Sequence, residues 1–285
     1  MAVTLRPIMP DDVPEAGRIC HDAFRAIASA HNFPPDFPNT EISTGLIGQL
    51  ARHPGFYGIV AEQDGKVVGS NFIDERAPII GLGPITVDPN VQNTGIGGAL
   101  MRHMIERATQ NRSPGLRLLQ SGYHTRSLCL YTKLGFSVRE PVANFQGPPL
   151  TLAIPGCTVR SAAVADEAAC NRLCEVVHGH DRGGELHDAV ADGTASVVER
   201  AGRITGYTTA IAFFGHAVGE TNDDLKALIG AAPAFAGPGF LIPSRNVDLF
   251  QWCLAQRLRM VQPLTLMTIG LYNEPQGAYL PSILY

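Results

Sequence analysis

Residues 85–100 combine residue types and a spacing that suit the binding of an anion. An apolar strand is predicted to end at Val87, and the pattern Gln92-x-x-Gly95-x-Gly97 then opens an amphipathic helix. Glycine lets a backbone approach a ligand closely, and the free N–H groups of a helix start attract negative charge. This arrangement is suited to a pyrophosphate group.

Two common nucleotide-binding motifs are excluded. No Gly-Lys-Ser or Gly-Lys-Thr follows these glycines, so the segment is not a P-loop. It also lacks the GxGxxG spacing with a downstream acidic partner that is typical of dinucleotide-binding domains. Taken alone, Gly95 and Gly97 would equally fit the close packing of a helix on a strand.

A second motif lies further along the chain, where residues 130–136 read Leu-Tyr-Thr-Lys-Leu-Gly-Phe. Together the two motifs resemble those of the GCN5-related N-acetyltransferase (GNAT) family. That family has a strand ending in Val-x-Pro, then Gln/Arg-x-x-Gly-x-Gly/Ala at a helix start, and later Leu-Tyr-x-Lys-x-Gly-Phe. The resemblance covers roughly Val3 to Pro141 and contains both motifs in order.

The resemblance implies a site for acetyl-CoA beside the strand predicted over 79–87. In this family that strand splays from the next one, and a backbone N–H near Val87 holds the thioester carbonyl. Pro84 fits a bulge or an unpaired stretch there, because proline cannot donate a hydrogen bond to a ladder. The residues expected to contact the cosubstrate are Ile85, Val87, Gln92, Asn93, Thr94, Gly95, Ile96, Gly97, Gly98, Ala99, His124 and Tyr131.

The catalytic groups implied by the resemblance are less specific. Tyr131 matches the family's usual general acid for the departing thiolate, and its alternative role is that of a core tyrosine. An ammonium group must lose a proton before it attacks, so a base or a water chain is needed. Asp74 and Glu75 are the candidate bases, and both also fit plain turn residues. His124 stands where the family often has Asn, so it is either a proton carrier or a surface histidine.

The elements that would position these residues alternate along the chain, which indicates a mixed sheet of the α/β or α+β class. Asp64 and Gly65 can adopt the positive φ angles of a tight hairpin turn. Strands are predicted at 3–7, 58–62, 66–73, 79–87 and 116–120, with a final strand starting at 136–139. Helices are predicted from Asp11 or Asp12 to Ala30, and over 42–52, 95–109 and 126–134.

The chain also contains an internal repeat. Its first block, Thr4-x-Arg6 with Asp12, Arg18 and Cys20, recurs 154 positions later. The block 62–69 recurs as 199–206, now 137 positions apart, and a weaker block recurs 122 positions apart. Three matches in order indicate a tandem duplication, and the period is far too long for a solenoid. The expected domains are 1–145 and 156–285, joined by a linker over 143–157 that contains three prolines.

The second copy lacks the motifs of the first. Its third strand is predicted at about 213–218, and the helix that follows has no Gln-x-x-Gly-x-Gly. Instead Glu220, Asp223 and Asp224 crowd the helix start, where they would repel a pyrophosphate. The repeat places Cys253 where the first copy has Tyr131. The second copy therefore resembles a degenerate GNAT domain that binds no coenzyme and has a structural role, with a regulatory ligand pocket as the alternative.

Composition narrows the class of protein. The chain of 285 residues carries a net charge of −4, which argues against nucleic acid as a partner. No apolar run is long enough for a membrane helix, so a cytoplasmic protein is expected. The six cysteines form no CxxC pair; Cys170 and Cys174 are expected in the core, Cys129 in packing, and no metal site is expected from His178 and His180. The apolar stretch 277–285 is expected to dock as an edge segment.

The sequence therefore predicts two tandem acyl-CoA N-acyltransferase (GNAT) folds. The predicted activity is the transfer of acetyl from acetyl-CoA to a primary amine of a small molecule or peptide, by direct attack and without a metal. The alternative is a non-catalytic acyl-CoA-binding or regulatory protein. A small cationic amine is weakly favoured as acceptor, and both a monomer with an internal pseudo-dimer and a homodimer remain open.

Overall fold

The computed structural model describes residues 3–285, which form two compact units. The first unit comprises Met1–Glu75, Ile79–Val138 and Met267–Leu271, as far as these residues are described. The second comprises Arg76–Pro78, Arg139–Leu266 and Tyr272–Tyr285. Both units therefore contain segments that are distant in sequence, and their limits depart from a simple division of the chain into two halves.

The first unit has the mixed α/β composition that the sequence predicted. Its sheet has the order β1-β2-β3-β4-β6, next to which lie the last residues of β13 (Arg259–Gly270). Most pairs are antiparallel, and β4 pairs with β6 in parallel. The elements of this unit are β1 (Thr4–Pro7), α1 (Val13–Ala30), α2 (Thr40–Arg52), β2 (Phe56–Gln63), β3 (Lys66–Asp74), β4 (Ile79–Leu82), β5 (Thr86–Val87), α3 (Ile96–Gln110), β6 (Gly115–Ser121) and α4 (Thr125–Lys133), with short 3-10 helices at Pro10–Asp12 and Pro89–Val91.

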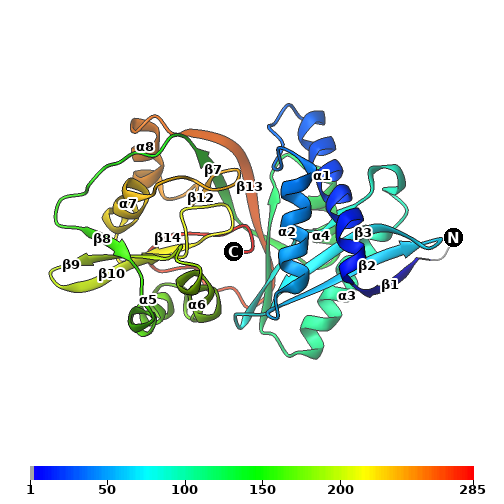
Figure 1. Ribbon diagram of the computed structural model, residues 1–285, viewed down its shortest axis with the longest axis horizontal. Coiled ribbons are helices and arrows are strands. Elements are labelled where there is room, and N and C mark those ends of the chain that lie inside the picture. Colours follow the sequence, from blue (N-terminus) through cyan, green and yellow to red (C-terminus); the bar gives the residue numbers. More distant parts are fainter. Residues whose placement is uncertain (1–2) are drawn as a thin grey trace. The chain divides into compact units, whose positions relative to one another are not determined.

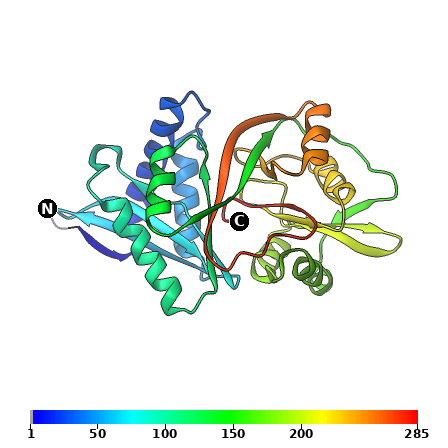
Figure 2. The ribbon, with the colours of Figure 1, turned by 180° about the vertical axis from the view of Figure 1, so that it is seen from behind.

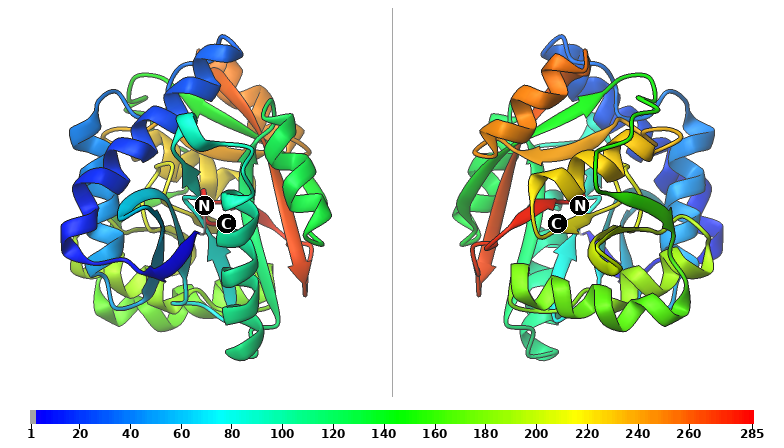
Figure 3. Two further views of the ribbon diagram at one scale, coloured as in Figure 1. Left: turned by 90° about the vertical axis from the view of Figure 1, so that its right-hand side faces the viewer. Right: turned by 90° about the vertical axis from the view of Figure 1, so that its left-hand side faces the viewer.

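Helices cover both faces of this sheet. Figure 1 shows α1 and α2 side by side across β2 and β3, and Figure 2 shows α3 and α4 on the opposite face. The left view of Figure 3 shows the strands between these two helix layers. Leu100, Met101 and Met104 of α3 are fully buried against the strands. Burial of each such side chain contributes about 1.5–3 kcal/mol to stability. This packing stabilises α3, whose first turn contains two glycines that disfavour a helix.

The predicted strand over 79–87 is divided into two parts. β4 pairs with β6 through residues 79–81, whereas β5 pairs only with β3, with Val87 opposite Gly69. Pro84 lies between β4 and β5, where it cannot donate a hydrogen bond to either neighbour, as the sequence indicated. The sheet is consequently open beside β5.

The second unit repeats the element order of the first. Its five-stranded sheet has the order β14-β11-β10-β9-β8, and the strands β13, β7 and β12 lie in that order beside one another. Figure 1 shows α5 and α6 on one side of the five-stranded sheet and α7 on the other. The elements are β7 (Ser137–Gln146), β8 (Thr158–Ser161), α5 (Glu167–His178), α6 (Gly183–Ala191), β9 (Ser196–Arg200), β10 (Arg203–Thr208), β11 (Ala217–Gly219), α7 (Asn222–Ala231), β12 (Phe240–Pro243), α8 (Val247–Ala255), β13 and β14 (Ala278–Leu280), with a 3-10 helix at Val164–Asp166.

Two predicted segments of the second copy need correction. The third strand comprises Ala217–Gly219 and not 213–218, because the chain turns at Phe213–Gly215 and the N–H of Gly215 donates to Ala212. The predicted linker is also shorter, since β7 continues to Gln146 and pairs with β12 there.

The duplication is visible in repeated hydrogen bonds. The guanidinium of Arg6 donates to Asp12 and to Glu62, and Arg160 does the same to Asp166 and Glu199, with Nη1–Oδ2 distances of 2.6 and 2.7 Å. These residues are related by the 154- and 137-residue offsets of the repeat. The repeated sequence blocks therefore correspond to the same arginine–carboxylate arrangement in both copies.

Backbone angles repeat in the same way. Asp64 and Gly65 have φ of 52° and 74°, and the corresponding Ala201 and Gly202 have 48° and 77°. Arg257 has a φ of 61° at the position that corresponds to Gly135, although a side chain rarely adopts this conformation. The second copy has therefore kept backbone geometry at positions where it has lost the residue that favours it.

Each unit is completed by a strand from the other copy of the repeat. The weakest sequence block relates β13 to β7, which makes them the final strands of the two copies. Residues 267–271 of β13 belong to the first unit, where β13 lies next to β6. Residues 139–146 of β7 belong to the second unit, where they pair with β12. The sequence did not predict this exchange.

Candidate functional site

The open edge of the sheet exposes backbone groups of Val87. The N–H of the next residue, Asp88, donates to Val68 of β3 at 2.9 Å. Successive N–H groups of a strand point to opposite sides, so the N–H of Val87 points away from β3. It therefore faces the opening beside β5, where no ladder with β6 is formed. The carbonyl of Val87 faces the same way and accepts from Nε2 of Gln92 at 3.1 Å.

The turn between β5 and α3 is held by a charged cluster. Asp88 accepts from the backbone N–H of Asn90 at 2.9 Å and from Arg18 of α1 at 2.9 Å. Arg18 also donates to Glu15 and Asp22 of its own helix. Partial burial would raise the pKa of Asp88, but the hydrogen bonds from Asn90 and Arg18 outweigh it and leave this pKa below its usual value. The turn is therefore anchored on α1 before the chain enters α3.

The start of α3 has the features of an anion site. Its N-cap is Gly95 with φ of 92°, no side chain caps the helix, and its first turn has no acidic residue. Asn93 also has a positive φ, of 67°. Asn93, Thr94 and Gly95 are exposed, and a Cβ built on Gly95 would meet no atom within 4 Å. A ligand can therefore approach the backbone of this turn without obstruction from a side chain.

The remaining residues predicted around this turn are placed as supports. Ile96 is buried in the core, and Ile85 and Val87 pack against the same core. Thr94 donates its hydroxyl to the carbonyl of Val91 at 2.7 Å, and the N–H of Ala99 donates to Gly95. Gly97 is in ordinary contact distance of Leu130 and Val87, while Gly98 adjoins Arg102.

The other side of the opening is formed by the end of β6 and the start of α4. Ser127 Oγ lies 2.8 Å from both the side-chain oxygen of Gln120 and the backbone oxygen of His124, so its single O–H is shared between these two acceptors. Two buried nitrogens here have no hydrogen-bond partner within the described chain, namely Nε2 of Gln120 and Nε2 of His124. Buried polar atoms normally have partners, so these two point to a ligand or water at this position.

His124 is neutral at physiological pH. Burial lowers the pKa of its imidazole to about 4, and the neighbouring Arg126 and His31 act in the same direction. A neutral ring can donate or accept one hydrogen bond at Nε2. His124 is therefore suited to a hydrogen-bonding role beside the opening more than to carrying a positive charge.

Arg126 is a further candidate site residue, which the sequence motifs did not indicate. Its guanidinium donates to Gln92 Oε1 at 2.5 Å and to Asn93 Oδ1 at 3.3 Å, which brings a cation to the exposed turn before α3. Gln120 and Ser127 were missed as well. No local pattern distinguishes them, because their significance depends on the approach of α4 to this turn.

Tyr131 lies in the core cluster of the first unit with 7% of its surface exposed. Its ring is 6.1 Å from that of Phe136. Burial raises the pKa of its phenol well above the usual range, so the hydroxyl keeps its proton at any physiological pH. The position is compatible both with a proton donor and with a core tyrosine.

The two candidate bases differ in their surroundings. Asp74 is the last residue of β3 and is 5% exposed, opposite Gly81 of β4. Glu75 accepts from Nε and Nη2 of Arg107 at 2.9 and 2.8 Å and from Asn111 at 2.8 Å. The carboxylate of Glu75 is thus engaged in holding the end of α3 to β3.

The cysteines and histidines outside this site differ in their burial. Cys170 and Cys174 are buried, as predicted, whereas Cys129 is exposed and the expectation that it serves packing was wrong. His178 is buried, and its backbone oxygen contacts Nδ1 of His180 at 3.2 Å. Within residues 3–285 no group of three His, Cys, Asp or Glu side chains could hold a metal ion. The helices of that range include none long and apolar enough to cross a membrane.

The first unit is thus a mixed α/β fold in which an open sheet edge lies next to a glycine-rich helix start. Residues 54–138 match the family model of the acetyltransferase (GNAT) domain. Over these residues the chain therefore contains a segment similar to the GNAT acetyltransferase domain, and its fold consists of two GNAT-type copies in tandem.

Solved structures share this architecture over nearly the whole chain. A candidate acetyltransferase from Pyrococcus horikoshii is similar with a TM-score of 0.75 and 18% identity, over 96% of this chain and 91% of its own. A GCN5-related N-acetyltransferase from Sphaerobacter thermophilus has a TM-score of 0.63 and 15% identity, over 97% of both chains. At these identities the likeness concerns the fold alone. Among curated proteins, no sequence matches this chain significantly.

Proposed function

We propose that the first copy binds acetyl-CoA and transfers its acetyl group to a primary amine of a small molecule or peptide. The observation that carries the proposal is the open sheet edge at Val87, placed directly before an uncapped helix start at Gly95. The N–H of Val87 can donate to a carbonyl oxygen, and the free N–H groups at the start of α3, a few residues later, can donate to an anion.

The residues of the first copy fit this cosubstrate. Its pyrophosphate would lie at the exposed turn Gln92–Gly97, where no acidic side chain opposes it and Arg126 contributes a positive charge. The unpartnered nitrogens of Gln120 and His124 would gain acceptors or donors from the cosubstrate or its bound water. When bound, acetyl-CoA supplies a thioester whose carbonyl carbon is open to attack by an amine.

The chain's own residues then divide the work of the reaction. The N–H of Val87 would stabilise negative charge that develops on the carbonyl oxygen. A bond forms from the amine nitrogen to the carbonyl carbon as the carbon–sulfur bond breaks, with no covalent bond to the protein. Tyr131 would deliver its proton to the departing thiolate, since burial keeps its phenol protonated, although the same raised pKa makes the phenol a weaker acid.

Asp74 and Glu75 are both candidates for the group that removes a proton from the amine. Both Asp74 and Glu75 lie at the end of β3, and Glu75 is occupied by Arg107 and Asn111. A base needs a lone pair available to the substrate within hydrogen-bond reach, either directly or through one water. The hydrogen bonds from Arg107 and Asn111 favour a structural role for Glu75. Asp74 is buried, which favours a fixed position of its side chain.

One experiment tests the proposal directly. Calorimetric titration of acetyl-CoA into the full chain is expected to show one site, and release of free thiol is then followed with a panel of primary amines. Binding together with amine-dependent thiol release supports the enzyme. Binding without turnover for the whole panel would instead favour the non-catalytic acyl-CoA-binding protein, and absence of binding would refute both.

A further inference from the structure

A short strand of the second unit occupies a position whose counterpart in the first unit is open. β14 (Ala278–Leu280) pairs antiparallel with β11, with Ala278 opposite Gly219, Tyr279 opposite Val218 and Leu280 opposite Ala217. It forms the edge of the five-stranded sheet and also contacts β12. The prediction that residues 277–285 dock as an edge segment is thereby confirmed, and the place where they dock is informative.

The hydrogen bonds identify β11 as the counterpart of β5. In the first unit Asp88 N donates to Val68 O at 2.9 Å, and in the second Glu220 N donates to Thr205 O at 2.9 Å. Val68 and Thr205 are separated by the 137-residue offset of the repeat. The strand pairs agree, since Val87 lies opposite Gly69 as Gly219 lies opposite the corresponding Gly206. Gly219 therefore occupies the position of Val87.

The consequence concerns the backbone N–H of this residue, which points away from β3 in the first unit and away from β10 in the second. In the first unit that of Val87 faces an opening, whereas by the same alternation that of Gly219 faces β14. We infer that the segment Gly277–Leu280 takes in the second unit the place that acetyl-CoA takes in the first. The chain then binds one coenzyme, and the second copy is closed by its own chain. This inference rests on the proposed function of the first copy.

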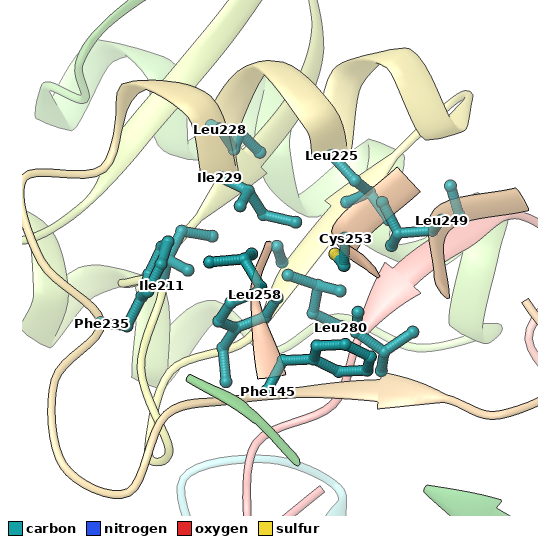
Figure 4. Packing of buried hydrophobic residues seen from close by; sticks show 14 of the residues in the cluster. Phe145, Ile211, Leu225, Leu228, Ile229, Phe235, Leu249, Cys253, Leu258 and Leu280 are labelled. Carbon is teal, nitrogen blue, oxygen red and sulfur yellow. The ribbon is translucent and has the colours of Figure 1, made fainter. Parts of the chain in front are cut away.

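The segment is held by apolar and polar anchors, which makes it a built part of the fold. Figure 4 shows Leu280 among Leu225, Leu249 and Phe145 in the core of the second unit. On the other side of the strand, the hydroxyl of Tyr279 donates to Glu140 at 2.7 Å.

Residues beyond β14 add further anchors. Nη2 of Arg182 donates to the hydroxyl of Ser282 at 3.2 Å, and the N–H of Ile283 donates to the backbone oxygen of Phe213 at 2.8 Å. Ser282 and Leu284 are buried as well. A ligand competing for β11 would have to displace this whole set of contacts.

The start of α7 is closed by a carboxylate of the same chain. Asp224 accepts from Thr221 N at 2.9 Å, from Arg200 Nε at 2.9 Å and from Thr205 Oγ1 at 2.6 Å, and it is fully buried. The carboxylate of Asp224 thus places a negative charge at the N-terminal end of α7, whereas the first turn of α3 has no acidic side chain.

A pocket of about 340 Å³ remains beside this helix start, near the low end of the range for small-molecule sites. Residues 277–279 form one of its walls. The pocket is lined by Glu220, Thr221, Asn222, Pro243, Arg245, Asn246, Gly277, Ala278 and Tyr279.

Hydrogen exchange of the full chain, read at peptide resolution with and without saturating acetyl-CoA, tests the inference. Amides of 217–219 are expected to exchange slowly without ligand and to remain unchanged with it, whereas those of 86–98 slow on addition. Slowing in both segments would refute the inference alone. Slowing in neither would refute the proposed function, and fast exchange at 217–219 in the free chain would refute the strand pairing itself.

A mild variant provides a second and independent test. Tyr279→Phe keeps the ring and removes the hydrogen bond to Glu140, so exchange at 217–219 and 278–280 should accelerate together by roughly tenfold. Tyr57→Phe is the matched control, because it removes a tyrosine hydroxyl that contacts His103 in the first unit. Acceleration confined to 278–280 in Tyr279→Phe would contradict the pairing of the two strands.

Discussion

Gly97 offers a way to test the anion site by charge alone. It is the second residue of α3, and a Cβ at this position would lie 3.6 Å from Leu130 Cδ2 and 3.8 Å from Val87 Cγ2, which are ordinary contact distances. Gly97→Glu and Gly97→Gln introduce side chains of nearly equal size that differ in one charge. Both replace a glycine inside a helix, which is expected to stabilise the helix by up to about 1 kcal/mol.

The expected effect on affinity follows from electrostatics. Two unit charges about 5 Å apart interact by about 3 kcal/mol at an effective dielectric of about 20. Gly97 is partly exposed, so screening reduces this value, and about 2 kcal/mol of repulsion between the introduced carboxylate and a pyrophosphate is a reasonable magnitude. Since about 1.4 kcal/mol is a factor of ten, Gly97→Glu should bind acetyl-CoA roughly 30-fold more weakly than Gly97→Gln.

Calorimetric titration of acetyl-CoA into both variants measures this difference, with circular dichroism and thermal melting as controls for folding. Raising the salt concentration should narrow the gap between the two variants, because the repulsion is screened. Equal affinities of the Gly97→Glu and Gly97→Gln variants would show that no anion binds at the start of α3, and the placement of the cosubstrate would then be wrong.

Three further changes address the acid, the histidine and the buried ion pair of the second unit. Tyr131→Phe should lower kcat by roughly 10²–10³ with little change in KM or thermal midpoint, and an unchanged kcat would make Tyr131 a core residue only. Burial lowers the pKa of His124 to about 4 in the folded state, below its unfolded value of about 6.5, so the stability of the wild type should be constant above about pH 6.5 and fall towards pH 4. Urea unfolding at several pH values should show a smaller loss of stability at low pH for His124→Asn. Equal losses in the wild type and the variant would contradict the burial of this ring. Arg182 donates two hydrogen bonds to Glu185 in a buried pair, so Glu185→Gln should destabilise the second unit by about 3–5 kcal/mol in denaturant titration, and a loss below about 1 kcal/mol would show that Arg182 finds another partner.

Several features of the fold could be predicted because they are encoded within a few residues. The hairpin turn at Asp64 and Gly65 follows from the φ angles these residues tolerate, and α1 follows from its apolar periodicity. The interruption at Pro84 follows from the missing N–H of proline. The duplication could be predicted because its marker residues, such as Arg6 and Arg160, hold the same corner in both copies.

The candidate site was predicted in part. The turn Gln92–Gly97 and Tyr131 carry motifs that are readable in one dimension, and the roles of these residues remain predictions. Arg126 carries no such signal, because its importance comes from reaching Gln92 across a separation of 34 residues. The sequence likewise does not show that Arg107 donates two hydrogen bonds to Glu75, because these residues are 32 positions apart.

The sequence by itself determined the class of fold, the tandem repeat and the loss of the glycine motif from the second copy. Only the tertiary structure decided which strands pair. It placed residues 267–271 of β13 in the first unit and β14 on β11 in the second. The physical reason is that a strand's residues specify which of its faces is buried, whereas its hydrogen-bonding edge is the same backbone in every sequence, so the partner at that edge is chosen by the packing of the whole unit.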